Sequence, residues 1–307
     1  MHQRQQTSRR NFFKTSCTAA GALLLGSVFS QGCAVAKGVK ATIPVDAHLW
    51  VYASRYPPSW DCTPILDDVF RDLKTAGYSG IEVMESILKH EDAVERLQAL
   101  THQHAIPVTG TSYYGDMWDK AQQQRIVEDV ENVAMRLNAV GGKRIGLTVG
   151  DAKRIKTETE LDTQAETLKK VITLCHKNNI TPNLHNHTFE VINNMHDLNG
   201  TLARLPDVKL GPDINWLVRG GVDPIKFIET HGHRMVYMHL RDQDAKGKWT
   251  EAVGEGVTNF NAIATALKKI NYSGAAAVEL AFDKPPKRAV RENWTQSRQY
   301  VKKVFGW

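Results

Sequence analysis

The chain alternates eight times between a short apolar segment and a longer segment whose apolar residues recur at helical spacing. Short apolar runs are typical of buried strands, and strands that alternate with helices pair in parallel. Eight such units in succession predict an α/β fold, a single (β/α)8 TIM barrel. The expected strands are 43–50, 80–84, 106–110, 144–149, 181–187, 208–214, 235–240 and 274–280. The expected helices are 65–76, 91–104, 120–137, 161–178, 195–205, 224–231, 260–270 and 293–305.

Polar residues end the last four expected strands, one on each strand: His185, Asp213, His239 and Glu279. The carboxyl ends of barrel strands meet at one rim, where barrel enzymes place their active sites. One histidine at a strand end is usually a hydrogen-bonded structural residue, but four ligand-type residues on consecutive strands favour a shared metal site. Two imidazoles and two carboxylates suit one divalent ion of Mn, Zn, Co or Fe better than Mg or Ca.

Further polar and aromatic residues are candidates for the same rim. His187 lies two residues after His185, so strand alternation directs both side chains to one face. His48 and Glu82 end the first two strands and are expected to bind substrate. Trp216 is expected to add an apolar wall against a sugar ring, although aromatic residues near a rim are as often plain packing.

The order of these motifs resembles the xylose-isomerase-like barrel superfamily, the sugar phosphate isomerase/epimerase group, over most of the chain after residue 42. The resemblance rests on His-Asn-His-x-x-Glu at 185–190, Asp-x-x-Trp at 213–216, Gly-x-Asp-Pro at 221–224, His-Leu-x-Asp at 239–242, Gly-Glu-Gly at 254–256 and Glu279.

The resemblance implies a metal-dependent isomerase or epimerase that acts on a carbohydrate through an enediolate. It implies one metal ligand per strand, catalytic roles for Glu279 and His187, and substrate contact by Glu190. Many members have Glu in place of His185 and His in place of Trp216. With one carboxylate of the usual pair absent, one-sided proton abstraction is expected. A metal-dependent lyase therefore stays an alternative, either an inosose-type dehydratase or an enzyme that eliminates the aglycone of a 3-keto-glycoside.

The first residues resemble an export signal. Residues 8–14, Ser-Arg-Arg-Asn-Phe-Phe-Lys, are similar to the twin-arginine motif, and an apolar run at 19–29 follows. That run is shorter than the ~20 residues that span a bilayer, and 34–36 offers a small-x-small cleavage site. We expect a signal peptide at 1–36, a barrel domain at 37–307, the Tat translocase as partner, and a periplasmic or exported protein. Alternatively, lipidation of Cys33 would anchor the chain to a membrane.

The expected export and the net charge of the chain limit the classes of ligand that it is expected to bind. Sugar phosphates are cytoplasmic, and the chain has no Gly-x-x-x-x-Gly-Lys phosphate loop, so a non-phosphorylated carbohydrate is expected. The net charge is +6, but four of the 39 basic residues and none of the 33 acidic residues lie within 1–36. The remaining +2 does not indicate a nucleic-acid partner.

Three points remain open to test. An alternative hypothesis from another functional class is that the chain is a non-catalytic periplasmic sugar-binding protein. The sequence does not decide whether the chain forms a homo-oligomer. Cys62 and Cys175 lie on different expected elements, so two buried thiols are expected rather than a disulfide.

Overall fold

The structure is a computed structural model that describes residues 42–307. The expected signal peptide at 1–36, with its twin arginines, its cleavage site and Cys33, lies outside the described residues.

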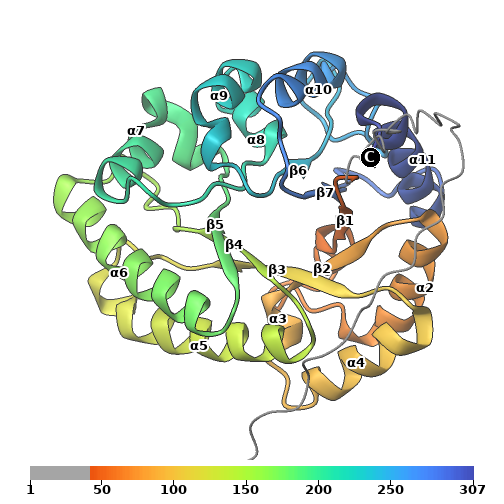
Figure 1. Cartoon of the computed structure of the whole chain (residues 1–307), viewed down its shortest axis with the longest axis horizontal. Coiled ribbons are helices and arrows are strands. Elements are labelled where there is room, and N and C mark those ends of the chain that lie inside the picture. The colour runs from red at the N-terminus through yellow and green to blue at the C-terminus, as the bar shows by residue number, and fades with distance from the viewer. Residues whose placement is uncertain (1–41) are drawn as a thin grey trace, which may run out of the picture. The chain divides into compact units, whose positions relative to one another are not determined.

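The strands form one parallel sheet that curls round on itself, in the order β5-β4-β3-β2-β1-β7-β6, inside a ring of helices (Figure 1). The strands in residues 42–307 are β1 Val45–His48, β2 Gly80–Met84, β3 Val108–Tyr114, β4 Arg144–Thr148, β5 Thr181–Leu184, β6 His239–Leu240 and β7 Ala276–Glu279. All the pairings between them are parallel, as the alternation of strands and helices predicts.

The segment 210–213 closes the ring between β5 and β6. Leu210 forms parallel bridges with Leu184 and Met235, and Asp213 forms one with His239. The predicted sixth strand is thus reduced to single bridges, because Pro212 has no N–H to donate to a ladder. Counted with this segment, eight strand positions complete the TIM barrel.

Eight long helices cover the outside of the barrel, near the eight predicted positions (Figure 1). For example, α2 buries Leu66, Val69, Phe70 and Leu73 on one face and ends at Gly77, whose φ of 85° suits glycine. The long helices in the described part are α2 Leu66–Ala76, α4 Ala93–His104, α5 Gln123–Ala139, α6 Glu158–Lys177, α7 Thr188–Arg204, α9 Pro224–His231, α10 Phe260–Lys269 and α11 Val290–Phe305.

Short helices that the sequence pattern did not predict follow three strand positions at their carboxyl ends. These are α1 Trp50–Ala53 after β1, α3 Glu85–Leu88 after β2, and α8 Ile214–Arg219 after the segment 210–213. Single 3-10 turns add η1 Thr63–Ile65, η2 Lys120–Gln122 and η3 Gly232–Arg234. The short helices therefore build up the rim on which the predicted site residues lie.

Helix α7 is interrupted soon after it begins. Asn193, Asn194 and Met195 adopt left-handed backbone angles, with φ between 53° and 58°. The predicted helix at 195–205 corresponds to the part after this break, whereas the first turn, which starts at Thr188 directly after His187, was not predicted.

The interior is polar at its centre as well as at its rim. Asp46 is fully buried, pairs with Arg144 at 2.6 Å and accepts a hydrogen bond from Thr109 at 2.8 Å.

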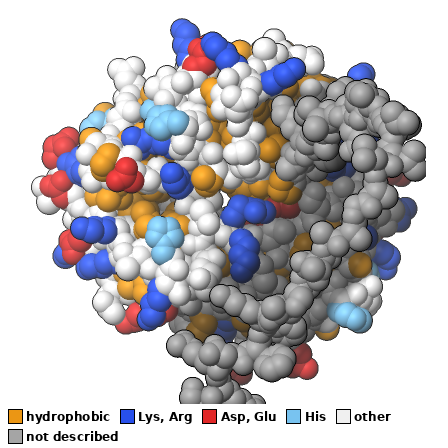
Figure 2. Space-filling model, in the orientation of Figure 1, with side chains coloured by type: hydrophobic (Ala, Val, Ile, Leu, Met, Phe, Trp, Pro, Cys, Tyr) orange, Lys and Arg blue, Asp and Glu red, His pale blue; other side chains and the backbone are white. Residues whose placement is uncertain are grey.

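Cys62 and Cys175 are free and buried, which confirms the prediction of two buried thiols. Basic and acidic side chains both appear on the face shown in Figure 2. Within residues 42–307, no helix has the length and apolar character needed to cross a membrane.

Candidate metal centre

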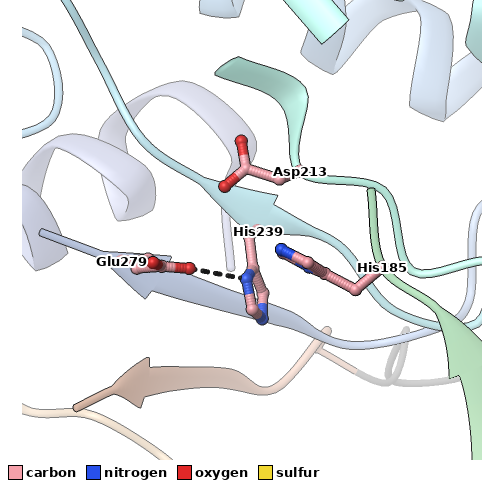
Figure 3. A group of neighbouring side chains, drawn as sticks. All are labelled: His185, Asp213, His239 and Glu279. Carbon is pink, nitrogen blue, oxygen red and sulfur yellow. Dashed lines mark ion pairs between the residues drawn. The ribbon is translucent and has the colours of Figure 1, made fainter. Parts of the chain in front are cut away.

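The structure brings the four predicted strand-end residues together (Figure 3). His185, Asp213, His239 and Glu279 each offer one ligand atom, and these atoms all lie within 4.8 Å of one another. The exposed fractions of the four residues lie between 0% and 8%. The residues come from the loop after β5, the segment 210–213, β6 and the end of β7. Their convergence follows from the barrel, because neighbouring strand ends meet at one rim.

Two acceptor atoms of the cluster lack a partner. Asp213 caps α8: its Oδ1 accepts hydrogen bonds from the backbone N–H of Asn215 at 2.8 Å and of Trp216 at 3.0 Å. Its Oδ2 has no hydrogen-bond partner, and neither does Nδ1 of His185. Buried polar atoms without partners cost free energy, and a cation between these two would satisfy both. Two imidazoles and two carboxylates therefore fit a divalent ion.

The carboxylate of Glu82 pairs with the imidazole of His239. The Glu82 Oε2 lies 2.8 Å from Nε2 of His239, while Nδ1 of His239 lies 2.8 Å from Oε2 of Glu279. Burial acts to raise the pKa of Glu82, but the imidazoles of His239 and His48 outweigh it and lower that pKa to about 2. Glu82 is only 1% exposed and does not line the pocket described next. The structure shows Glu82 in contact with His239, and its contact with substrate stays a prediction.

A pocket of about 410 Å³ opens over the cluster. Four of the predicted substrate or catalytic residues line it: His48, His187, Trp216 and Glu279. The Nε2 of His48 lies 3.1 Å from Ser112 Oγ, and burial lowers the pKa of His48 to about 3. The lining residues are His48, Trp50, Ser59, Trp60, Met84, Glu85, Ser86, Ser112, Tyr113, Tyr114, Thr148, His185, His187, Trp216, His239, Arg241, Trp249 and Glu279.

His187 lies beside the cluster at the start of α7. Its ring centroid is 5.0 Å from that of His185 and 5.5 Å from the parallel ring of Phe189. Burial, and then the charge of Arg241, lower the pKa of His187 to about 3. The imidazole is therefore neutral at neutral pH and has a nitrogen that can accept a proton.

The side chain of Glu190 is buried next to His187 and does not reach the pocket. Its Oε2 accepts a hydrogen bond from the backbone N–H of His187 at 2.7 Å, and the side chain is buried. Burial raises the pKa of Glu190 well above its usual value. Glu190 does not line the pocket, and its contact with substrate stays a prediction. The structure gives it a positioning role for His187, because the first turn of α7 directs Glu190 inward.

Arg241 belongs to the site although the sequence reasoning gave it no role. Its guanidinium contacts the carboxylate of Glu279, and its Nε lies 3.8 Å from Oδ2 of Asp213. Burial lowers the pKa of Arg241 to about 10, which leaves it charged at neutral pH. A signal was present, since Arg241 shares a strand face with His239. Trp249, in the loop after β6, had no such signal.

Comparison with known proteins agrees with the architecture. A family model described as "Xylose isomerase-like TIM barrel" matches residues 70–303, more than half of the chain. The comparison with curated proteins found no match.

Solved structures with the same fold include three that cover most of this chain. A sugar phosphate isomerase/epimerase from Parabacteroides distasonis is 17% identical, with a TM-score of 0.68 over 86% of this chain and 95% of that one. The 3-keto-D-glucoside 4-epimerase from E. coli is 15% identical, with a TM-score of 0.66 over 85% and 100%. A protein described as the probable 3-DHS dehydratase from Bacillus anthracis is 13% identical, with a TM-score of 0.65 over 85% and 99%. Identities this low establish the fold alone.

Proposed function

Since the chain belongs to the xylose isomerase-like TIM barrel family, we propose that it is a metal-dependent sugar isomerase or epimerase that acts on a non-phosphorylated carbohydrate. The observation that carries the proposal is the cluster of four buried residues whose ligand atoms lie within 4.8 Å of one another, below a pocket. In two of these residues, Asp213 and His185, a buried acceptor atom has no hydrogen-bond partner. Solved structures with this fold include proteins named as sugar isomerases or epimerases, which supports the reaction class.

The residues of the cluster would hold one divalent ion of Mn, Zn, Co or Fe. Such an ion, when bound, supplies a Lewis acid that stabilises negative charge on adjacent sugar oxygens, as in an enediolate. The imidazole nitrogens of His185 and His239 suit this role as metal ligands. Burial lowers the pKa of His185 well below its usual value, so it stays neutral.

The proton is handled by side chains of the pocket. His187 is neutral and has a buried Nδ1 without a partner, so it can accept a proton from the carbon next to a carbonyl. Glu279 is the second candidate, because it is the one carboxylate of the cluster that lines the pocket. Arg241, in contact with Glu279, would stabilise the charge that develops on the substrate oxygen.

A metal-dependent lyase is the second candidate, and a specific observation favours it. Within the cluster Glu279 lines the pocket and Asp213 does not. Two-base epimerisation needs proton-handling groups on opposite faces of the sugar, whereas proton removal from one face suits loss of a β-leaving group. Such an enzyme would dehydrate an inosose-like ketone or eliminate the aglycone of a 3-keto-glycoside. A dehydratase name among the solved structures supports this alternative.

The test is purification with native metal, followed by incubation with ketoses, inososes and 3-keto-glycosides and analysis by mass spectrometry. A new sugar of unchanged mass supports the isomerase or epimerase. Loss of water or of an aglycone supports the lyase instead. Binding without any turnover would contradict both and favour a sugar-binding protein.

We also propose that the protein is exported to the periplasm by the twin-arginine pathway, with the barrel domain at 37–307. Residues 8–14 and the apolar run at 19–29 support this proposal. A protein that acquires its metal while folding in the cytoplasm suits a pathway that exports folded chains. Lipidation at Cys33 is the competing outcome, and it would tether the protein to a membrane.

A further inference from the structure

Aromatic side chains extend the pocket from the buried cluster to the surface. Six of the lining residues are Trp or Tyr. The candidate metal ligands are at most 8% exposed, whereas Trp60 is 39% exposed and Tyr114 is 48% exposed. The pocket therefore has a polar floor and an aromatic mouth. A sugar ring with its oxygens at the floor leaves the indoles at the mouth uncovered.

The backbone at Trp60 is held in an unusual conformation. Its φ is 52°, in the left-handed region that bulky residues rarely adopt. The N–H of Trp60 donates to the Tyr56 carbonyl at 2.8 Å, and its carbonyl accepts from Ser86 Oγ at 2.9 Å. The indole lies against Trp50, with ring centroids 5.4 Å apart. Backbone strain of this kind is concentrated at ligand sites, and here it places a large aromatic ring at the mouth of the pocket.

A second tryptophan pair lines the same pocket from another part of the ring. The centroids of Trp216 and Trp249 lie 5.2 Å apart, with their planes nearly perpendicular. The guanidinium carbons of Arg219 and Arg241 lie 3.4 Å and 4.5 Å from the centroid of Trp249. These contacts fix Trp249 in place, so this side of the mouth is preformed.

The basic residue nearest to this second pair is already engaged. Arg219 donates to the side chains of Asn215 and Gln243 at 3.0 Å and 2.9 Å, and also to the carbonyl of Gly247. Arg219 itself does not line the pocket. Arg241 does line the pocket, but its guanidinium contacts the carboxylate of Glu279. Both guanidinium groups beside this pair are therefore engaged by protein groups, and the mouth offers aromatic side chains to a neutral ring.

We propose that the two pairs, Trp50 with Trp60 and Trp216 with Trp249, form an outer subsite for the second ring of a glycoside. The sugar ring lies over the cluster, and a six-membered aglycone ring, aryl or pyranose, lies between the indoles. Both kinds of ring present a flat face that stacks on an aromatic side chain. This inference rests on the proposed function and deepens it, because the substrate becomes an intact glycoside, not a free monosaccharide.

The experiment measures the affinity of the metal-loaded protein for methyl and phenyl glycosides of glucose, galactose and mannose, and for the corresponding disaccharides. Binding is followed by calorimetry and by tryptophan fluorescence. We expect at least one sugar for which the phenyl glycoside or the disaccharide binds about 10-fold more tightly than the methyl glycoside, as stacking and burial of one ring imply. A preference for the phenyl glycoside identifies an aryl aglycone, and a preference for the disaccharide identifies a sugar.

Variants locate the preference at the mouth. Trp60→Ala should remove the preference while leaving the affinity for the methyl glycoside unchanged, and Trp60→Phe should retain most of it. Trp118→Ala, at a tryptophan that does not line the pocket, is the matched control and should leave both affinities unchanged. Thermal unfolding of each variant checks that the barrel remains folded.

Three results would overturn the subsite: equal affinity for methyl and ring-bearing glycosides, no binding of any glycoside, or equal weakening of both ligand classes by Trp60→Ala. The proposed function fails separately. A protein that prefers ring-bearing glycosides but turns none of the keto-sugars over would retain the subsite and lose the enzymatic assignment.

Discussion

Glu82 accepts a hydrogen bond from His239 inside the barrel, with 2.8 Å between Oε2 and Nε2. The two residues are 157 positions apart in the sequence, and both are almost completely buried. The bond fixes the orientation of the imidazole and directs its other nitrogen, Nδ1, toward Glu279. A carboxylate behind a histidine ligand is the arrangement that orients such ligands in metal sites.

Glu82→Gln should therefore weaken metal binding by about 10- to 100-fold without removing a ligand, because His239 loses a charged partner. The measurement is competition for the metal with a chelator of known affinity. Glu85→Gln is the matched control, since Glu85 lines the pocket but is not part of the cluster. An unchanged affinity in Glu82→Gln would show that Glu82 does not position His239.

The mechanism makes a separate prediction for His187. His187→Asn should retain the metal and lose activity by about 10²-fold or more, as removal of a general acid/base does. Steady-state rates and elemental analysis of the same preparation separate the two effects. His233→Asn, at an exposed histidine, should leave both unchanged. Nearly full activity of His187→Asn would point instead to another proton carrier, with His48 first among the lining residues.

The fold was largely predictable because each βα unit repeats the same pattern, a short apolar run followed by apolar residues at helical spacing. The least regular parts of the fold could not be predicted in this way. The segment 210–213 reads as a strand, yet Pro212 and the cap of α8 by Asp213 leave it only single bridges. The rim helices α1 and α3 have only four residues each, too few for a periodic signal.

The sequence predicted which residues gather at the candidate site better than it predicted which of their side chains reach the pocket. The four strand-end residues converge because the topology of the barrel places them there. Period-two alternation cannot tell a side chain that reaches the pocket from one that supports it, as Glu82 shows. Alternation placed Arg241 on the same strand face as His239, but it could not show that the guanidinium contacts Glu279. The role of Glu190 depends on the first turn of α7, which begins sooner after β5 than the pattern indicated.

Burial of the two cysteines predicts their reactivity. Burial raises the pKa of the Cys62 and Cys175 thiols to about 12, whereas an unfolded cysteine titrates near ~8.5. Because the folded pKa is the higher one, the thiols favour the folded state fully below ~8.5 and lose this contribution as pH rises toward 12. Iodoacetamide at pH 8 should label neither thiol in the folded protein and both after denaturation, as counted by mass spectrometry. Rapid labelling of the folded protein would contradict their burial.

Export can be tested with two conservative changes. Replacing both Arg9 and Arg10 with Lys should hold the precursor in the cytoplasm, because the twin-arginine pathway discriminates between these side chains. Cell fractionation gives the result, with Arg4→Lys as the control outside the motif. Normal export of the double variant would argue against this pathway. The mature N-terminus should lie near Lys37, and a lipid on Cys33 would replace a soluble location with an anchored one.

The most direct test of the central claim is elemental analysis of the purified protein together with its Asp213→Ala and Glu279→Ala variants. The account predicts one divalent ion per chain in the wild type, and loss of both metal and turnover in each variant, because each change removes a ligand of the cluster. Trp216→Ala, at a residue that lines the pocket outside the cluster, should keep its metal. A stoichiometric ion in either Asp213→Ala or Glu279→Ala would contradict the assignment of the site.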